Sequence, residues 1–212
     1  VRGFGVEAQR EDRWSMGGSS ELLTGGRISS EWVEAEDFTH AYSGQVPVTK
    51  DTRLAGALFG EWLWRPGPWL VAPGLRASVY RFNVRASDTP TWWLPEPRLT
   101  VRRAVGAQWH LKGAVGRYSQ MPAVDRYAQG VGNPTLPLSQ AWQASGGAEW
   151  SRGVWSVDSA VYAGWMQHLV QRELALTLVS DGEQVRSEVR PEFRDVQGRA
   201  QGIELMVRNQ PS

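Results

Sequence analysis

The sequence predicts an all-β fold, an antiparallel transmembrane β-barrel to which this chain contributes about eight strands of a larger whole. Three observations predict it. Apolar and polar side chains alternate between residues 51 and 119, tryptophans mark segment ends, and short turns alternate with long loops. Successive strand residues point to opposite faces, so one face meets an apolar environment and the other a polar one. Repeated segments of this kind, each about 10 residues long, cross a bilayer around a polar lumen.

The alternation is clearest in residues 52–64. Leu54 and Leu58 fall on one face of this segment, while Arg53 and Glu61 fall on the other. The next segment repeats the pattern with Leu75 on its apolar face. Both segments are long enough to cross a bilayer as tilted strands.

The predicted strands follow the chain in order. They are residues 1–12, 52–64, 69–82, 98–105, 109–119, 139–150, 154–168 and 199–208. Short turns are predicted at residues 65–68, 106–107 and 151–153, and long loops at residues 13–50, 83–97, 120–138 and 169–198. Antiparallel outer-membrane barrels have short periplasmic turns and long extracellular loops. The alternation of short turns and long loops therefore also predicts which end of each strand lies at the periplasmic side and which at the extracellular side.

Tryptophans gather beside the predicted short turns. They are Trp62, Trp64, Trp69, Trp109, Trp150 and Trp155. Tryptophan concentrates at membrane–water interfaces, so these residues predict a periplasmic aromatic girdle. A soluble β-sandwich also alternates, but nothing in it requires tryptophans at one end of every hairpin.

Composition excludes several classes of protein. The formal net charge is +1 and arginines are scattered, whereas a nucleic-acid footprint needs a basic patch. The chain has no cysteine, so disulfides and thiolate metal sites are not available. No apolar window is long enough for a spanning helix. No export signal precedes residue 1, so we expect a fragment of a longer precursor.

The end of the chain also predicts a fragment. Eight strands could close a small barrel, but residues 200–212 contain no aromatic residue at the end of the last strand. An open sheet edge cannot remain in lipid, because its backbone groups would stay unsatisfied. We therefore expect residues 1–212 to be part of a barrel domain, with a plug domain and the remaining strands elsewhere in the parent chain.

Several short motifs resemble TonB-dependent outer-membrane receptors. Residues 111–122, LKGAVGRYSQMP, are similar to a strand-to-loop passage of their barrels, and residues 132–139, GNPTLPLS, to the "GNPxLxPE" segment that follows. The family's glutamate is absent from the second motif. Residues 97–102, PRLTVR, and 202–205, GIEL, resemble two further strands of such barrels, in the family's order.

The resemblance implies a function in transport. Such receptors have about 22 strands and a plugged lumen. They bind an extracellular small-molecule ligand, such as a metal chelate, cobalamin or a saccharide, and an inner-membrane TonB complex acts on the plug. The implied location is the bacterial outer membrane, with outer-membrane lipid and the TonB energy-coupling complex as partners. No nucleic-acid partner and no cofactor are implied.

One set of residues is predicted to contact the ligand, because polar and aromatic side chains there could hold an anionic or planar molecule. The set lies at the top of one strand, in its outer loop and in the neighbouring hairpin: Trp92, Trp93, Arg117, Tyr118, Met121, Arg126 and Tyr127. The alternative is structural, with both tryptophans in an outer girdle and Tyr118 in lumen packing.

Other polar residues are predicted to be structural. An inward charge network is expected from Arg76, Arg98, Arg102, Lys112, Glu149, Asp158 and Glu204. An acidic cluster beside His40, formed by Glu31, Glu34, Glu36 and Asp37, is predicted to be a solvated loop rather than a Ca²⁺ site. Histidines show no metal-ligand spacing and no nucleophile elbow is present, so neither a metal site nor an enzyme is predicted.

Two other functions fit part of the pattern. A passive porin-like or small closed barrel shares the alternation, but the ordered motifs and long loops favour the receptor. A soluble β-sandwich with a binding or adhesive role predicts that the outward apolar residues are buried against a second sheet. That set is Leu54, Leu58, Leu75, Val79, Val101 and Val115.

Overall fold

The computed structural model describes residues 2–36, 48–84, 91–121, 137–180 and 185–209. These residues form nine strands: β1 (Arg2–Ser15), β2 (Ser20–Glu36), β3 (Val48–Trp64), β4 (Trp69–Val84), β5 (Thr91–Val105), β6 (Trp109–Gln120), β7 (Ser139–Arg152), β8 (Trp155–Ser180) and β9 (Val185–Asn209). Within the described residues there is no helix that could cross a membrane.

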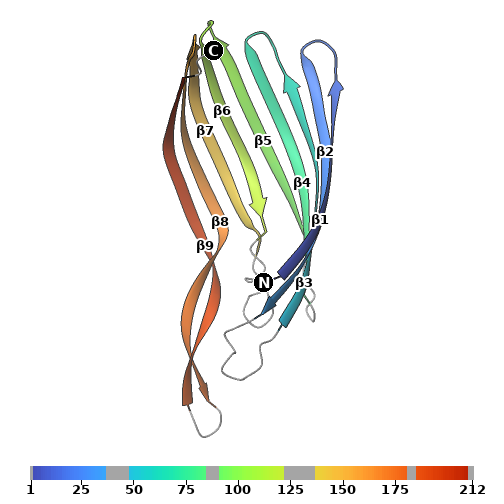
Figure 1. Cartoon of the computed structure of the whole chain (residues 1–212), viewed down its shortest axis with the longest axis vertical. Coiled ribbons are helices and arrows are strands. Elements are labelled where there is room, and N and C mark those ends of the chain that lie inside the picture. The colour runs from blue at the N-terminus through green and yellow to red at the C-terminus, as the bar shows by residue number, and fades with distance from the viewer. Residues whose placement is uncertain (1, 37–47, 85–90, 122–136, 181–184, 210–212) are drawn as a thin grey trace.

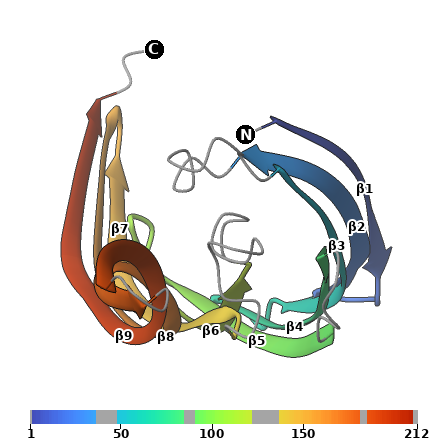
Figure 2. The same cartoon turned by 90° about the horizontal axis from the view of Figure 1, so that it is seen from below.

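The strands form one curved antiparallel sheet in which each strand pairs with the next along the chain (Figure 1). The sheet order is β1 to β9, and no pairing between β9 and β1 occurs among the described residues. Viewed along the strands, the sheet forms a wall around an open lumen (Figure 2). The predicted fold class, a partial antiparallel barrel, is confirmed.

Three predicted loops are wrong at least in part. Residues 83–97 include the start of β5, which begins at Thr91 because it pairs with β4 there. Residues 13–50 contain β2, which pairs with both β1 and β3. Its Gly and Ser residues dilute the alternation, and its neighbours supply the pairing that its own propensity lacks. Residues 169–198 were also predicted as a loop, but they lie largely in β8 and β9, whose hairpin extends beyond the rest of the sheet (Figure 1).

Each of the three predicted short turns contains a glycine in a backbone conformation that other residues rarely adopt. The φ angles are +60° at Gly67, +72° at Gly106 and +57° at Gly153. Glycine reaches this left-handed region without a steric penalty, which allows a strand to reverse within a few residues. All these turns lie at one end of the sheet, as predicted (Figure 1).

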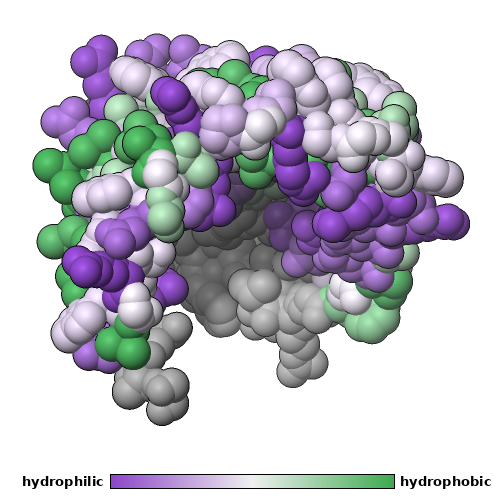
Figure 3. All heavy atoms as spheres, turned by 90° about the horizontal axis from the view of Figure 1, so that it is seen from above, coloured by the Kyte–Doolittle hydropathy of each residue, from purple (hydrophilic) through white to green (hydrophobic). Residues whose placement is uncertain are grey.

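The cross-strand register defines an outer and an inner face. Leu58 of β3 lies opposite Ala77 of β4, and Leu99 of β5 lies opposite Val115 of β6. Most of the exposed large apolar residues lie on this outer face, and each of the nine strands carries at least one of them. No second sheet covers them among the described residues, so the β-sandwich alternative is wrong. In the space-filling view, hydrophilic side chains border the hollow (Figure 3).

Two belts of aromatic residues frame the outer face. The belt beside the short turns includes Trp14, Trp62, Trp69, Trp109 and Trp155, and the belt towards the loops includes Phe4, Trp32, Trp93, Trp142 and Trp165. Ten positions separate the belts on β1 (14 − 4) and on β8 (165 − 155). Ten residues of a strand tilted at about 40° span roughly 25 Å, the height of a lipid-facing band.

The packing of β7 against β8 depends on glycine at one position. A Cβ at Gly147 would lie 2.1 Å from the backbone oxygen of Ser159, whereas a Cβ at Gly146 would lie no closer than 4.0 Å to its neighbours. We predict that Gly147→Ala lowers the free energy of unfolding by about 1–3 kcal/mol, because backbone must move to relieve the overlap. The matched variant Gly146→Ala should be close to neutral. Urea unfolding of the full-length protein in detergent measures both, and equal effects would contradict the packing described here.

Candidate functional site on the inner wall

An apolar cluster lies on the inner wall near the loop end of the sheet. Leu138 and Val170 are buried there, and they pack with side chains from β4, β5 and the segment that follows β6: Tyr80, Trp92, Leu94 and Met121. Met121 and Leu138 lie at the two ends of the connection between β6 and β7. The connection therefore starts and finishes against the inner wall.

A buried carboxylate joins three strands below this cluster. Glu96 is 6% exposed. Its carboxylate accepts hydrogen bonds from the Ser119 backbone N–H (2.6 Å) and the fully buried Ser78 hydroxyl (2.9 Å), and also from the Ser119 hydroxyl. The Arg76 Nε atom lies 3.3 Å from the same carboxylate. These contacts tie β4, β5 and β6 together.

The position of Glu96 follows from its neighbours. Pro95 and Pro97 have no N–H group, and the β5–β6 pairing ends at Arg98 opposite Gly116 although β5 continues to Thr91. Beyond that point the Glu96 side chain supplies the acceptor that the Ser119 N–H needs. Glu96 was not among the predicted functional residues; a glutamate between two prolines in a strand is the sequence signal that indicates it.

A concave recess lies on the inner faces of β6 to β9. Its volume is about 550 Å³. Larger polar, aromatic and sulfur-containing residues frame it: Lys112, Tyr118, Gln143, Ser145, Tyr162, Met166 and Glu204. Small and apolar residues form its floor: Ala114, Val115, Ala144, Ala160, Ala163, Gly164 and Ala200. Of these residues only Tyr118 was predicted to contact ligand.

A charge network lies on the inner wall towards the short turns. Lys112 Nζ donates to both Asp158 carboxylate oxygens at 2.6 Å and lies 3.3 Å from Glu149. Arg102 bonds to the same Glu149. These pairs and the Arg76–Glu96 pair confirm part of the predicted network. Arg98 and Glu204 lie on the same face by register, but neither makes an ion pair with another described residue.

The predicted ligand-contacting residues do not form one group. Trp92 and Met121 pack in the apolar cluster, and Tyr118 lines the recess. Trp93 is 72% exposed on the outer face, in the belt towards the loops. Arg117 donates a 2.5 Å hydrogen bond to Gln140. Arg126 and Tyr127 lie outside the described residues.

The predicted acidic loop is wrong in part, because Glu31, Glu34 and Glu36 lie in β2. Glu31 accepts a 2.5 Å hydrogen bond from Arg53 of β3. Asp37 and His40 lie outside the described residues. In the part of the chain that the structure describes, no group of His, Cys, Asp and Glu side chains could hold a metal ion.

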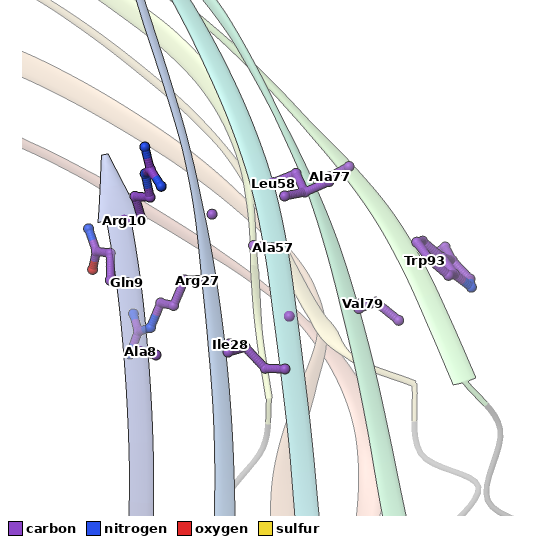
Figure 4. A pocket seen from close by; sticks show the side chains of 12 residues that line it. Ala8, Gln9, Arg10, Arg27, Ile28, Ala57, Leu58, Ala77, Val79 and Trp93 are labelled. Carbon is purple, nitrogen blue, oxygen red and sulfur yellow. The ribbon is translucent and has the colours of Figure 1, made fainter. Parts of the chain in front are cut away.

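A second hollow lies on the outer face of β1 to β5 (Figure 4). Most of its lining is small and apolar, including Ala8, Ile28, Leu58, Val79 and Trp93, and Gln9, Arg10 and Arg27 complete it. Because the apolar side chains belong to the outer face, the hollow faces away from the lumen.

Together, the apolar outer face, its two aromatic belts and the charged inner wall define the wall of a transmembrane β-barrel. Residues 2–210 match the family described as TonB dependent receptor-like, beta-barrel. The chain belongs to this family. Its members are outer-membrane transporters and receptors rather than enzymes.

Solved structures agree with this assignment at the level of the fold. The copper transporter OprC superposes with a TM-score of 0.75 at 14% identity, covering 99% of this chain and 35% of that one. The FrpB iron transporter from Neisseria meningitidis (F3-3 variant) superposes with a TM-score of 0.67 at 11% identity, covering 98% of this chain and 34% of that one. The siderophore receptor PirA from Pseudomonas aeruginosa superposes with a TM-score of 0.63 at 16% identity, covering 96% of this chain and 36% of that one.

The chain thus spans about a third of the length of these three structures. A comparison with curated protein sequences finds no match.

Proposed function

We propose that this chain is part of a bacterial outer-membrane receptor that takes up an extracellular ligand with energy from the inner membrane. The observation that carries the proposal is the family match over residues 2–210. Similar structures include a copper transporter and an iron transporter. The charged inner wall supports the proposal, because a polar lumen suits a transported solute rather than lipid.

We also propose that residues 1–212 are a portion of the barrel domain, and that the parent chain supplies a plug domain and further strands. Two observations support this. The similar structures are about three times as long, and the sheet is open between β1 and β9. An open sheet edge would leave backbone N–H and C=O groups unsatisfied in lipid. The proposed partners are outer-membrane lipid, the ligand and the TonB complex, which would act through the plug.

Within this portion, we propose that the ligand first contacts the inner wall near the loops. Tyr118 lines the recess, and Trp92 and Met121 pack in the apolar cluster near the loop end of the inner wall. Arg117 and the loop residues Arg126 and Tyr127 remain candidates for contact from the rim, whereas we propose that Trp93, on the outer face, belongs to the aromatic belt. A ligand that enters from outside meets these residues before the charge network around Lys112.

Energy-dependent uptake tests the proposal. Cells that carry the full-length parent protein are given labelled maltohexaose, ferrioxamine B or cyanocobalamin, with and without an uncoupler of the proton gradient. We expect saturable uptake of one of these compounds, falling to background with the uncoupler. Uptake that rises linearly with concentration and ignores the uncoupler would instead indicate a passive pore.

A further inference from the structure

We propose that the recess on β6 to β9 binds a neutral, hydroxyl-rich ring compound, an oligosaccharide in chemical class. This inference rests on the proposed uptake function and specifies its ligand. It is carried by three features of the recess: two tyrosine rings that lie along the wall, polar groups between them, and a charge balance that is not cationic.

Both tyrosine rings lie along the wall rather than across the lumen. A Cβ at Gly202 would lie 2.5 Å from the Tyr162 hydroxyl oxygen, so the ring of Tyr162 covers Gly202 on the adjacent strand. A Cβ at Gly116 would lie 3.0 Å from the Tyr118 hydroxyl oxygen, so the ring of Tyr118 lies back along its own strand. Each tyrosine is 41% exposed. A ring held flat in this way turns a face towards the lumen.

The two tyrosines are spaced for a chain of sugar units rather than for a single ring. Tyr118 is on β6 and Tyr162 is on β8, and they are offset by four residues along the strands, because Tyr118 lies opposite Ala141 of β7 whereas Tyr162 lies opposite Ser145. Two strand spacings and four residues of rise place their backbones about 16 Å apart. Gln143 and Ser145 of β7 lie between the two strands that carry the rings. Glycine and alanine in the floor keep this space open.

The recess combines ring faces with hydrogen-bonding groups. The face of an aromatic ring is electronegative and attracts the C–H groups of a sugar ring. The Gln143 amide offers donors and an acceptor, and the Ser145 hydroxyl offers both, which matches the hydroxyl groups at the edge of a sugar. A purely apolar planar ligand would leave these polar groups buried without partners, which costs about 1–3 kcal/mol for each.

The charge of the recess disfavours an anionic ligand. Its one cation, Lys112, is held by Asp158 and lies 3.3 Å from Glu149. Glu204, at the other side of the recess, has no ion-pair partner among the described residues. A carboxylate-rich or catecholate chelate would therefore find no unpaired cation among the described residues that line the recess.

The recess lies where a ligand from outside can reach it. Tyr118 lies one position beyond Arg117, whose register partner Trp142 is in the aromatic belt towards the loops. Tyr162 lies three positions from Trp165 of the same belt. The recess thus extends from the loop half of the wall to Lys112, where the charge network towards the short turns begins.

Equilibrium binding to the full-length receptor in detergent tests the inference. The probes are maltohexaose, xylohexaose and mannohexaose, with ferric enterobactin and ferrioxamine B as chelate probes. We expect saturable binding of one hexasaccharide. Tyr162→Ala and Gln143→Ala should each weaken it roughly five- to tenfold, the scale of one lost ring or polar contact. Tyr162→Phe should keep it, because the ring face remains, and Met206→Ala, on the inner wall outside the recess, serves as the control.

The outcomes separate this inference from the proposed function. Binding of a chelate but no hexasaccharide, binding of none of the probes, or hexasaccharide binding unchanged in the Gln143→Ala variant would overturn the recess assignment. Because equilibrium binding needs no energy source, a receptor that binds the sugar but shows uncoupler-insensitive uptake would overturn only the proposed function. Gln143→Ala decides the result if Tyr162→Ala fails to fold.

Discussion

Leu205→Lys is expected to prevent assembly into membranes, whereas Met206→Lys, one residue further on, should be tolerated. Leu205 is exposed on the outer face of β9, and Met206 is exposed on the inner face. Both lie between the positions that pair with Trp165 and Trp155, within the span between the two aromatic belts. A lysine that faces lipid near the midplane costs roughly 2–4 kcal/mol, whereas the same lysine in the lumen stays hydrated.

The two variants are compared in the full-length protein by membrane fractionation and by heat-modifiable mobility on gels, which reports a folded barrel. The pair is well matched, because sequence position, strand and depth are nearly the same. If both variants assembled equally well, the assignment of the outer face would be wrong.

The second large effect is expected at Glu96. Glu96→Leu should lower the free energy of unfolding by about 3–5 kcal/mol, because it leaves Arg76 and the Ser119 N–H without their buried acceptor. Glu96→Gln should lower the free energy of unfolding by less, since its amide oxygen can still accept one of the hydrogen bonds. Urea unfolding of the full-length receptor in detergent measures both.

A neighbouring position provides the control for this series. Thr100 lies on the same face of β5, four residues further along and outside the Glu96 network. Thr100→Val should change stability by much less than Glu96→Leu. A Glu96→Leu protein as stable as the Thr100→Val protein would show that the Glu96 contacts do not hold β5 and β6 together.

The sequence predicted the parts of the fold in which alternation is strong. β3 has large apolar residues at Leu54, Leu58 and Trp62 and was found with its turn. β2 was not found, because Gly25 and Gly26 interrupt its pattern and its strand conformation depends on pairing with β1 and β3. Long-range pairing of this kind leaves no local signal in a single sequence.

The lengths of β8 and β9 were underestimated for a different reason. The β8–β9 register shifts between Met166 and Leu169, where two residues of β8 lie opposite one of β9. His168 has a φ of +58° at this bulge, and its backbone oxygen accepts a 2.7 Å hydrogen bond from Ser139. A bulge reverses the alternation that follows, so the predicted strand stopped at His168.

The site was harder to predict than the wall. The residues proposed from the strand-to-loop motif are divided between the two faces, because Trp92 and Trp93 are adjacent in a strand and must point in opposite directions. Tyr162 and Gln143 come from strands distant in sequence from Tyr118, and only the register places them together. A single sequence indicates which face of a strand each residue lies on, but it does not indicate the register between neighbouring strands.

Single-cysteine labelling along β9 tests the central claim, that this sheet is a wall between lipid and a polar lumen. Cysteines are placed one at a time at residues 202 to 207 of the full-length protein in cells and treated with a membrane-impermeant maleimide. We expect labelling at Glu204 and Met206 and protection at Ile203, Leu205 and Val207, and also protection at Gly202, which the Tyr162 ring covers. Labelling that is uniform along the strand, or that alternates in the opposite phase, would contradict it.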